Sequence, residues 1–389
     1  MLNSASLQSA AALLQEAVDN GDIPSAVAWA GDAYHDYPII AYGRRRYPTA
    51  SRHFRARYQQ PQAHPATVPA HIADADGLNN ASMSATDNLS VNNATYYDLA
   101  SLTKVMVTLP SVLHLVSAGE FSLEDKVQHF FAQAGWMQKP SLGQVRVRDL
   151  LTHSAGLPAW LPLFAHTSER LVALGEVLQS PLPNLGKYCY SDVGFILLGA
   201  IVERVSGQRL DAFAQQALFA PLGIRSLCYG PLEQQAVAAT EDCGWRNQLL
   251  EGIVHDENAY ALQGIAGHAG LFGDIHGVAA YARAWLQRDS RLASPALLQE
   301  ARREQLRSED GVRRGLGWML KDPQASVGAR ASEAAYGHTG FTGTSLWVDP
   351  EQGWFAVLLS NRVHPYRSCG QNIHSLRRQF YEAVSAAAV

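Results

Sequence analysis

The stretch that organises the chain is DLASLTK, residues 98–104, which opens the apolar helical run VMVTLPSVLHLVSAG, residues 105–119. Ser101 and Lys104 are three residues apart, so on a helix they lie on one face, one turn from each other. A serine hydroxyl becomes a nucleophile when a neighbouring base takes its proton, and a lysine can be that base if desolvation lowers its pKa. Free N–H groups and partial positive charge at the helix N-terminus would hold an oxyanion beside Ser101.

The same stretch also fits a purely structural interpretation. An amphipathic core helix with a surface lysine produces the Ser-x-x-Lys spacing equally well, and so short a motif is weak by itself. The choice between a catalytic and a structural role therefore depends on the rest of the chain.

The composition is that of a globular protein without a charged binding surface. The 389 residues are 47% apolar and 17% charged, and the net charge of −4 is spread along the sequence. The chain has no basic stripe, which disfavours nucleic-acid binding. It also lacks the run of 18 or more apolar residues that a membrane-spanning helix needs. The partner that we expect is a small-molecule or peptide substrate, with no cofactor; the oligomeric state is left open.

The N-terminal residues 1–21 lack the pattern of an export signal. They contain no basic residue, and polar side chains interrupt the apolar positions, so we expect an amphipathic helix ending near Gly21. The cysteines lack the Cys-x-x-Cys spacing of metal or redox sites; they are Cys189, Cys228, Cys243 and Cys369. Free thiols and a cytoplasmic location are therefore the expectation.

Strand patterns lie at the two ends of the chain, and helical patterns fill its middle. The strand candidates are residues 23–31, 37–43, 313–320, 344–350 and 353–362. We therefore expect residues 1–389 to form one unit of the α+β class. Residues 1–100 and 275–389 would build an antiparallel sheet flanked by the terminal helices, and residues 101–274 a mainly helical lobe, with the site in the cleft between them.

A polar insertion, residues 44–93, interrupts this pattern. Its first half is basic and its second half slightly acidic, and few of its side chains are large and apolar. Such a segment cannot bury much surface, which predicts a long loop or a partly disordered insertion. A basic arm for an anionic partner is the functional alternative.

Two further stretches would complete a site around Ser101. The first is Tyr190-Ser191-Asp192, because a lysine ammonium favours the ionised form of a nearby phenol, which can then shuttle protons; the alternative is a core tyrosine next to a helix N-cap. The second is GHTGFTGT, residues 337–344, whose glycines let the backbone approach a ligand. A backbone N–H of Phe341 could join that of Ser101 as an oxyanion donor. The alternative is a glycine-rich turn.

The three stretches, in this order and spacing, resemble the serine β-lactamase and penicillin-binding protein superfamily, and within it the class C branch. That branch carries Ser-x-x-Lys, then Tyr-x-Asn, then Lys-Thr-Gly. RDLLTHSAGLP (148–158), YSDVGFILLGAIVERVSG (190–207) and VHDENAYALQGIAGHAGLFG (254–273) are also similar to this family, the last most like members described as penicillin-binding protein 4B-like. The polar insertion does not match.

The resemblance implies a role for each matching residue. Ser101 would be the acylated nucleophile and Lys104 the acceptor of its proton. Tyr190 would pass a proton to the leaving group and later activate water. Asp192, at the position of the family's asparagine, would lie near Lys104 and the substrate amide. The strand that binds substrate would carry His338, Thr339 and Gly340.

Two positions depart from the family pattern. His338 replaces a lysine, and a histidine is neutral about as often as charged near pH 7, which weakens the case for β-lactam hydrolysis. Asp192 places a carboxylate near Lys104, which favours the charged lysine. The proton path would then depend more on Tyr190.

The sequence thus predicts a serine hydrolase that cleaves a D-amino-acid peptide, a muropeptide or a small ester, with a β-lactamase or a non-catalytic sensor as alternatives. A metal site is disfavoured because no pair among the possible ligands has the His-x-x-x-His spacing of a catalytic zinc site; these ligands are His255, Asp256, Glu257, His268, Asp274 and His276. Nucleotide binding by GIAGHAGLFG, residues 264–273, is disfavoured because the stretch lacks the Lys-Ser/Thr of a phosphate-binding loop.

Overall fold

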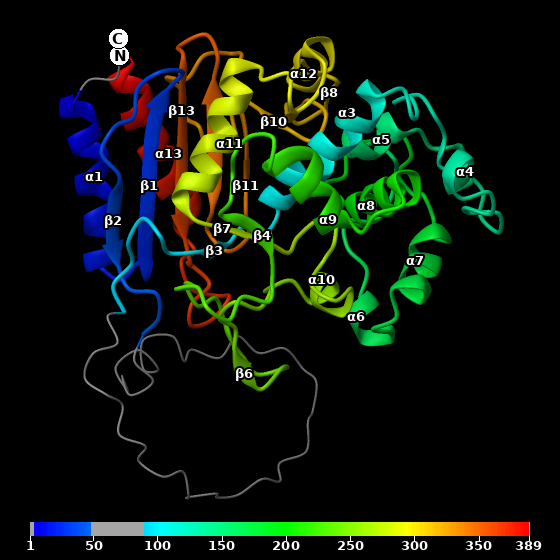
Figure 1. Cartoon of the computed structure of the whole chain (residues 1–389), viewed down its shortest axis with the longest axis horizontal. Coiled ribbons are helices and arrows are strands. Elements are labelled where there is room, and N and C mark those ends of the chain that lie inside the picture. The colour runs from blue at the N-terminus through cyan, green and yellow to red at the C-terminus, as the bar shows by residue number, and fades with distance from the viewer. Residues whose placement is uncertain (1–3, 48–88, 389) are drawn as a thin grey trace, which may run out of the picture.

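The computed structural model describes residues 4–47 and 89–388, and an eight-stranded antiparallel sheet forms one half of it, beside a helical part (Figure 1). Its spatial order is β2-β1-β13-β12-β11-β10-β9-β8. The strands are β1 (Ser25–Asp32), β2 (Ile40–Gly43), β8 (Leu306–Arg307), β9 (Arg313–Arg314), β10 (Met319–Leu320), β11 (Tyr336–Thr339), β12 (Ser345–Asp349) and β13 (Trp354–Ser360). Because β1 pairs with β13, strands from both chain ends share the sheet. The predicted α+β class is confirmed.

Side-chain alternation divides the core into two layers. Successive side chains of a strand point to opposite faces, and in β13 Phe355, Val357 and Leu359 join one apolar cluster while Trp354, Ala356 and Leu358 join the other. Every residue of β13 is buried, because helices cover both faces of the sheet.

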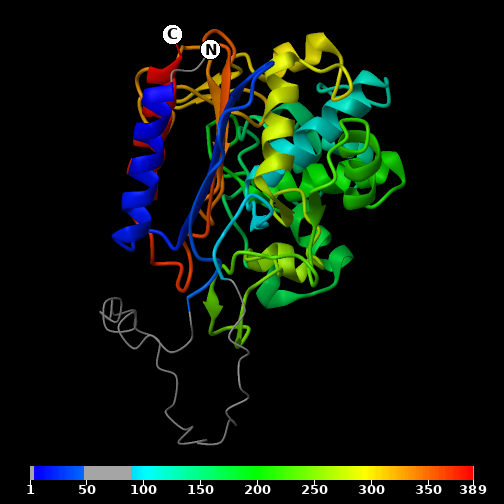
Figure 2. The same cartoon turned by 60° about the vertical axis from the view of Figure 1, so that its left-hand side comes forward.

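Figure 2 shows the layers from the side. Helices α1 (Ser4–Asp19) and α13 (Ile373–Ala387) pack together over one face, and α11 (Ile275–Gln287) packs on β1, β12 and β13 from the other. The first helix ends as predicted, because Gly21 follows it with a φ of 74°.

The helical part of the molecule lies beyond α11 (Figure 1). It contains α3 (Leu109–Ser117), α4 (Val127–Phe130), α5 (Val147–Leu151), α6 (Leu163–His166), α7 (Arg170–Leu178), α8 (Asp192–Ser206), α9 (Leu210–Ala214), α10 (Glu257–Ala261) and α12 (Pro295–Ala301), with short turns η1 (Lys104–Thr108), η2 (Leu142–Gln144) and η3 (Gln215–Phe219). Two small sheets join β3 (Tyr97–Asp98), β7 (Leu271–Gly273) and β4 (Leu227–Tyr229), and β5 (Asp242–Cys243) and β6 (Gln248–Leu249).

Pro110 disturbs the helix that follows Ser101, as the sequence predicts. Residues 104–108 form a π-helical turn, in which the Leu109 N–H donates to the Lys104 carbonyl. A proline has no N–H and crowds the preceding turn, and a π-turn widens the helix where the ordinary bond is lost. The widened turn contains Lys104.

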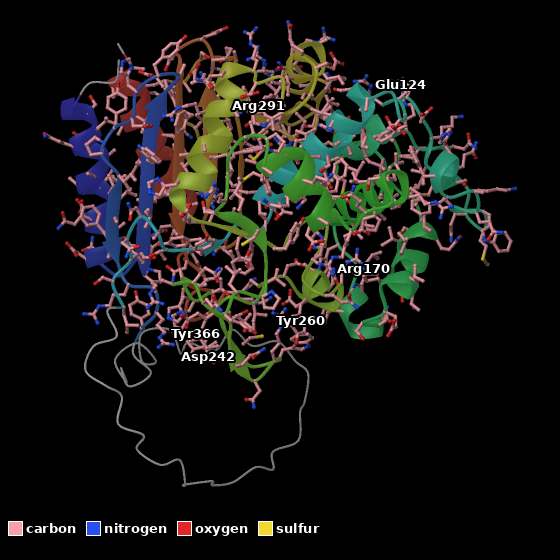
Figure 3. The ribbon with its side chains drawn as sticks, viewed as in Figure 1. Glu124, Arg170, Asp242, Tyr260, Arg291 and Tyr366 are labelled. Carbon is pink, nitrogen blue, oxygen red and sulfur yellow. The ribbon has the colours of Figure 1, made fainter. Side chains whose placement is uncertain are left out.

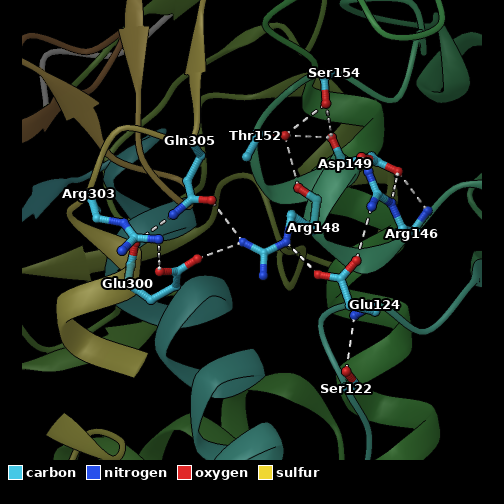
Figure 4. A network of polar contacts seen from close by, with 10 residues as sticks. All are labelled: Ser122, Glu124, Arg146, Arg148, Asp149, Thr152, Ser154, Glu300, Arg303 and Gln305. Atoms are coloured by element: carbon cyan, nitrogen blue, oxygen red, sulfur yellow. Dashed lines mark hydrogen bonds and ion pairs between the residues drawn. The ribbon is translucent and has the colours of Figure 1, made fainter. Parts of the chain in front are cut away.

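A polar network ties the helical part to the strands of the far sheet edge (Figure 4). Arg148 of α5 donates to Glu124 Oε1 at 2.6 Å, to Glu300 Oε1 of α12 at 3.0 Å and to Gln305 Oε1 at 2.8 Å. Because α5 leads directly into His153, this network anchors the segment that places the His153 ring against Tyr190.

The structure corrects one strand and leaves one segment untested. RRGLGWML was expected to be a single strand, but β9 and β10 pair with each other and Gly317 turns the chain between them with a φ of 71°. The polar insertion lies mostly outside the described residues; at its two ends Arg44 and Ser90 form an antiparallel bridge.

Two other expectations concern the whole chain. All four cysteines are free. Among the described residues, no helix combines the length and the apolarity that crossing a bilayer requires.

We expect the side chain of Asp349 to stabilise the β12–β13 hairpin strongly. Its buried carboxylate accepts from the N–H and hydroxyl of Ser332 and from the N–H groups of Glu351 and Gln352. Asp349→Ala would leave these donors unpaired, and we expect the free energy of unfolding to fall by about 2–4 kcal/mol in urea. Glu351→Ala, in the same turn with an exposed side chain, should change it by less than ~0.5 kcal/mol; equal effects would contradict this account.

Candidate active site

A strained turn presents Ser101 between β3 and the following helix. Ala100 has a φ of 46°, a left-handed conformation that is costly for a residue with a Cβ. Asp98 Oδ1 accepts from the Ala100 N–H at 2.8 Å, and the Leu99 carbonyl accepts from the Leu102 N–H at 3.0 Å. These bonds hold the turn, and Ser101 lines a cavity of about 620 Å³.

Lys104 is fully buried beside Ser101. Its Nζ donates to Ser101 Oγ at 2.9 Å and to the His268 carbonyl at 3.2 Å, and it forms an ion pair with Asp192 Oδ1 at 2.6 Å. Burial alone lowers the pKa of Lys104, but the Asp192 carboxylate and the Tyr190 phenol outweigh it and raise that pKa. The raised pKa favours the charged lysine, as expected from the carboxylate of Asp192, and the role of Lys104 as acceptor of the serine proton stays a prediction.

The Tyr190 ring lies close to the imidazoles of His153 and His338 and to the ammonium of Lys104. Its ring centroid is 5.0 Å from Lys104 Nζ, 4.6 Å from the His153 ring and 6.0 Å from the His338 ring. The next residue, Ser191, is the N-cap of α8, as the structural interpretation of this stretch predicted: its Oγ accepts from the Gly194 N–H.

His338 and His153 are buried, neutral neighbours of Tyr190. Burial, followed by the charges of Lys104 and Arg314, lowers the pKa of His338 to about 3 and that of His153 well below its usual value. His338 Nδ1 donates to the Thr339 carbonyl at 2.9 Å, and His338 is only 2% exposed. The structure thus places its imidazole behind Tyr190, whereas Asp192, Thr339 and Gly340 line the cavity.

The proposed oxyanion donors, the N–H groups of Ser101 and Phe341, belong to two segments that are hydrogen-bonded to each other. Thr342 Oγ1 donates to the Asp98 carbonyl at 2.7 Å and Thr344 Oγ1 to the Leu99 carbonyl at 3.1 Å. A Cβ on Gly340 would lie 2.6 Å from the Leu99 oxygen, so only glycine fits there. Ser101 and Phe341 both line the cavity, and their backbone N–H groups have no partner within residues 4–47 and 89–388.

Three arginines form a cationic wall of the cavity that the sequence analysis missed. Arg367 pairs with Glu241 at 2.7 Å and Glu257 at 2.6 Å. Arg362 and Arg377 have no carboxylate partner among the described residues: Arg362 lies 4.6 Å over the Phe341 ring, and Arg377 donates to the Gly340 and Thr344 carbonyls. These two cations are available to an anion.

The special role of one of these arginines could have been predicted from the sequence. Arg377 falls within the apolar stripe of the C-terminal helix, in the same stripe as Ile373, Phe380 and Val384. A charge in a core-facing stripe indicates a special partner, here two backbone carbonyls. Arg362 follows β13 without any such pattern.

Two of the histidines considered for a metal site are held in separate pairs. His255 contacts Glu241 at 3.0 Å and His268 contacts Asp256 at 2.7 Å. No group of three potential ligands occurs in the described part of the chain. The glycine-rich stretch packs on α8, where a Cβ on Gly267 would overlap the Phe195 carbonyl oxygen.

Comparisons with known proteins identify the family of the chain. Residues 56–377 match the family model described as Beta-lactamase. The N-acetylmuramyl-L-alanine amidase of Bacillus subtilis (strain 168) is 32% identical over 305 residues, 69% of this chain and 68% of that protein.

Two solved structures share the fold. EstCE1, a hydrolase with promiscuous acyltransferase activity, superposes with a TM-score of 0.72 at 18% identity, over 98% of this chain and 99% of that one. The octameric penicillin-binding protein homologue from Pyrococcus abyssi gives 0.65 at 18%, over 95% and 75%.

Fold, site and relatives together define a serine hydrolase of the penicillin-recognising type. The chain belongs to the β-lactamase family, as its three motifs predicted. The match begins inside the polar insertion, and the class C assignment stays a prediction.

The neutral state of His338 predicts a pH dependence of stability. Between pH 3 and the unfolded value near 6.5 the unfolded chain binds a proton that the native imidazole does not, so the free energy of unfolding rises with pH in this window. His338→Asn should reduce that slope by up to ~1.4 kcal/mol per pH unit, measured by urea unfolding from pH 4.5 to 6.5. An unchanged slope would contradict a buried neutral His338.

Proposed function

We propose that the protein hydrolyses an amide bond of a cell-wall muropeptide through an acyl-enzyme on Ser101. The observation that carries the proposal is the 2.9 Å contact of Lys104 Nζ with Ser101 Oγ, beside a cavity with two unpaired backbone N–H groups. This proximity of a hydroxyl, a buried cation and two free N–H groups supports their roles as nucleophile, stabilising charge and oxyanion donors.

In the first half of the reaction, Ser101 Oγ bonds to the carbonyl carbon and its proton passes to the phenolate of Tyr190. Lys104 stays an ammonium and stabilises that phenolate, in keeping with its raised pKa. The carbonyl oxygen becomes an oxyanion that accepts from the N–H groups of Ser101 and Phe341. The C–N bond then breaks, and Tyr190 returns the proton to the leaving amine.

In the second half, water replaces the amine. The Tyr190 phenolate takes a proton from water, the hydroxide adds to the acyl carbon, and the bond to Ser101 Oγ breaks as Oγ regains the proton. Asp192 holds Lys104 in place, and Thr339 and Gly340 border the substrate. His338 and His153 are positioning residues, because they pack on the Tyr190 ring.

Two observations support an amide of a muropeptide as the substrate. The B. subtilis relative is named for the bond between an N-acetylmuramyl group and L-alanine. Arg362 and Arg377 would suit the carboxylates of a leaving peptide. A β-lactam is less suited, because the third motif carries a neutral imidazole where a lysine would supply a permanent cation.

Covalent labelling tests the nucleophile. A fluorophosphonate probe should add once to the intact protein, with the adduct mapped to Ser101 by mass spectrometry, and Ser101→Ala should lose it. Ser111→Ala is the matched control: this serine lies in α3, is buried, and its Oγ has no partner in the described residues. Equal labelling of Ser101→Ala and wild type would overturn the proposal. Amide hydrolysis that survives Ser101→Ala and is abolished by a chelator would favour a metal enzyme.

A further inference from the structure

Four aromatic side chains form a continuous surface that leads out of the cavity. We call this the aromatic strip: Trp160, Phe164, Trp245 and Tyr260. Neighbouring ring centroids are 6.0 Å apart for Trp160–Phe164, 5.2 Å for Phe164–Trp245 and 6.0 Å for Trp245–Tyr260. Trp160 and Phe164 line the cavity with Ser101, and the other two extend the strip outward.

The strip remains open to water. Trp160 is 45% exposed, Trp245 54% and Tyr260 41%. A soluble protein rarely leaves several large rings exposed side by side unless they bind something. Tyr260 belongs to α10, which packs against α6, and Figure 3 labels it at the lower edge of the helical part.

Polar contacts hold the strip rigid. The Arg246 guanidinium lies 4.9 Å over Trp245 and 4.2 Å over Tyr260, and donates to the Val254 and His255 carbonyls at 2.6 and 3.0 Å. Asn258 of α10 accepts from the Phe164 N–H at 3.0 Å and donates to the Leu161 carbonyl at 2.8 Å. Three separate segments of the chain are thereby fixed to one another, so the rings are ordered before ligand binds.

We propose that the aromatic strip binds a hexose ring of the substrate, on the acyl side of the bond that Ser101 attacks. This inference rests on the proposed function and names a sugar site within it. A pyranose presents weakly positive C–H groups from its face, which suit the negative face of an aromatic ring, and polar hydroxyls from its edge. The rim around the strip carries the charged groups of Arg246, Glu257 and Arg367 that such hydroxyls can bond.

The competing occupant is an apolar acyl chain. An alkyl chain gains most where a closed slot removes its surface from water. The strip instead keeps its rings about half exposed among charged groups. A sugar ring, which has an apolar face and a polar edge, fits this surface better than an alkyl chain does.

Two matched substrates test the inference: N-acetylmuramyl-L-alanyl-D-isoglutamine and D-lactoyl-L-alanyl-D-isoglutamine, which share the scissile amide and differ in the sugar. Wild type should cleave the sugar-bearing amide with the higher kcat/KM. Trp245→Ala and Tyr260→Ala should each lower the ratio of the two kcat/KM values by about tenfold. Trp136→Ala, at a still more exposed tryptophan that does not line the cavity, should leave the ratio unchanged.

The remaining outcomes are equally decisive. An unchanged ratio in Trp245→Ala and Tyr260→Ala overturns the sugar site, as does a larger loss on octanoyl-L-alanyl-D-isoglutamine than on the sugar substrate. If neither amide is cleaved although Ser101 is labelled, the proposed substrate fails. Saturation-transfer NMR with N-acetylmuramic acid on wild type and Trp245→Ala then decides the strip separately: transfer lost in the variant supports it, and no transfer to wild type overturns it.

Discussion

The buried ammonium of Lys104 is the constraint on which the site depends. An isolated charge in a protein interior is costly, and it persists only when paired and hydrogen-bonded. Lys104 Nζ has three partners: the carboxylate of Asp192 at the start of α8, the His268 carbonyl in the loop before β7, and Ser101 Oγ. The π-helical turn that begins at Lys104 lies where these segments meet. Satisfying one cation thus brings the nucleophile, the second motif and the glycine-rich stretch together.

A second set of bonds connects this centre to the large sheet. The Thr342 and Thr344 hydroxyls donate to the backbone just before Ser101. Arg377 of α13 donates to the Gly340 carbonyl, in the segment that carries these two threonines. The C-terminal helix therefore contributes to a site whose nucleophile lies more than two hundred residues earlier. The cavity is lined both by arginines, which suit the carboxylates of a peptide, and by Trp160 and Phe164 of the aromatic strip, which we propose to bind a sugar. Together these two kinds of side chain fit the proposed substrate, an amide that joins a sugar-bearing acyl group to a peptide.

Much of this could be predicted from the sequence, because strand alternation, Gly and Pro stops and the three motifs are local patterns. The strand patterns at residues 23–31 and 353–362 predicted a sheet built from both chain ends. The helical spacing of Ser101 and Lys104 predicted that these two side chains lie close together. What could not be predicted depends on segments that meet only in the fold. The burial of His338 results from packing on Tyr190, which also contacts His153. The aromatic strip combines α6, α10 and the β5–β6 turn, whose sequences show no common pattern.

The charge state of Lys104 is the central claim, and the pH profile of acylation in Asp192→Asn tests it most directly. Removing the carboxylate lowers the lysine pKa. If the ammonium is required, acylation of Asp192→Asn will fall at high pH well before wild type does, with no gain near neutral pH. If instead neutral Lys104 is the base that activates Ser101, the profile will move in the opposite direction: the rate of Asp192→Asn will rise at lower pH and exceed wild type near pH 7. That result would contradict the account.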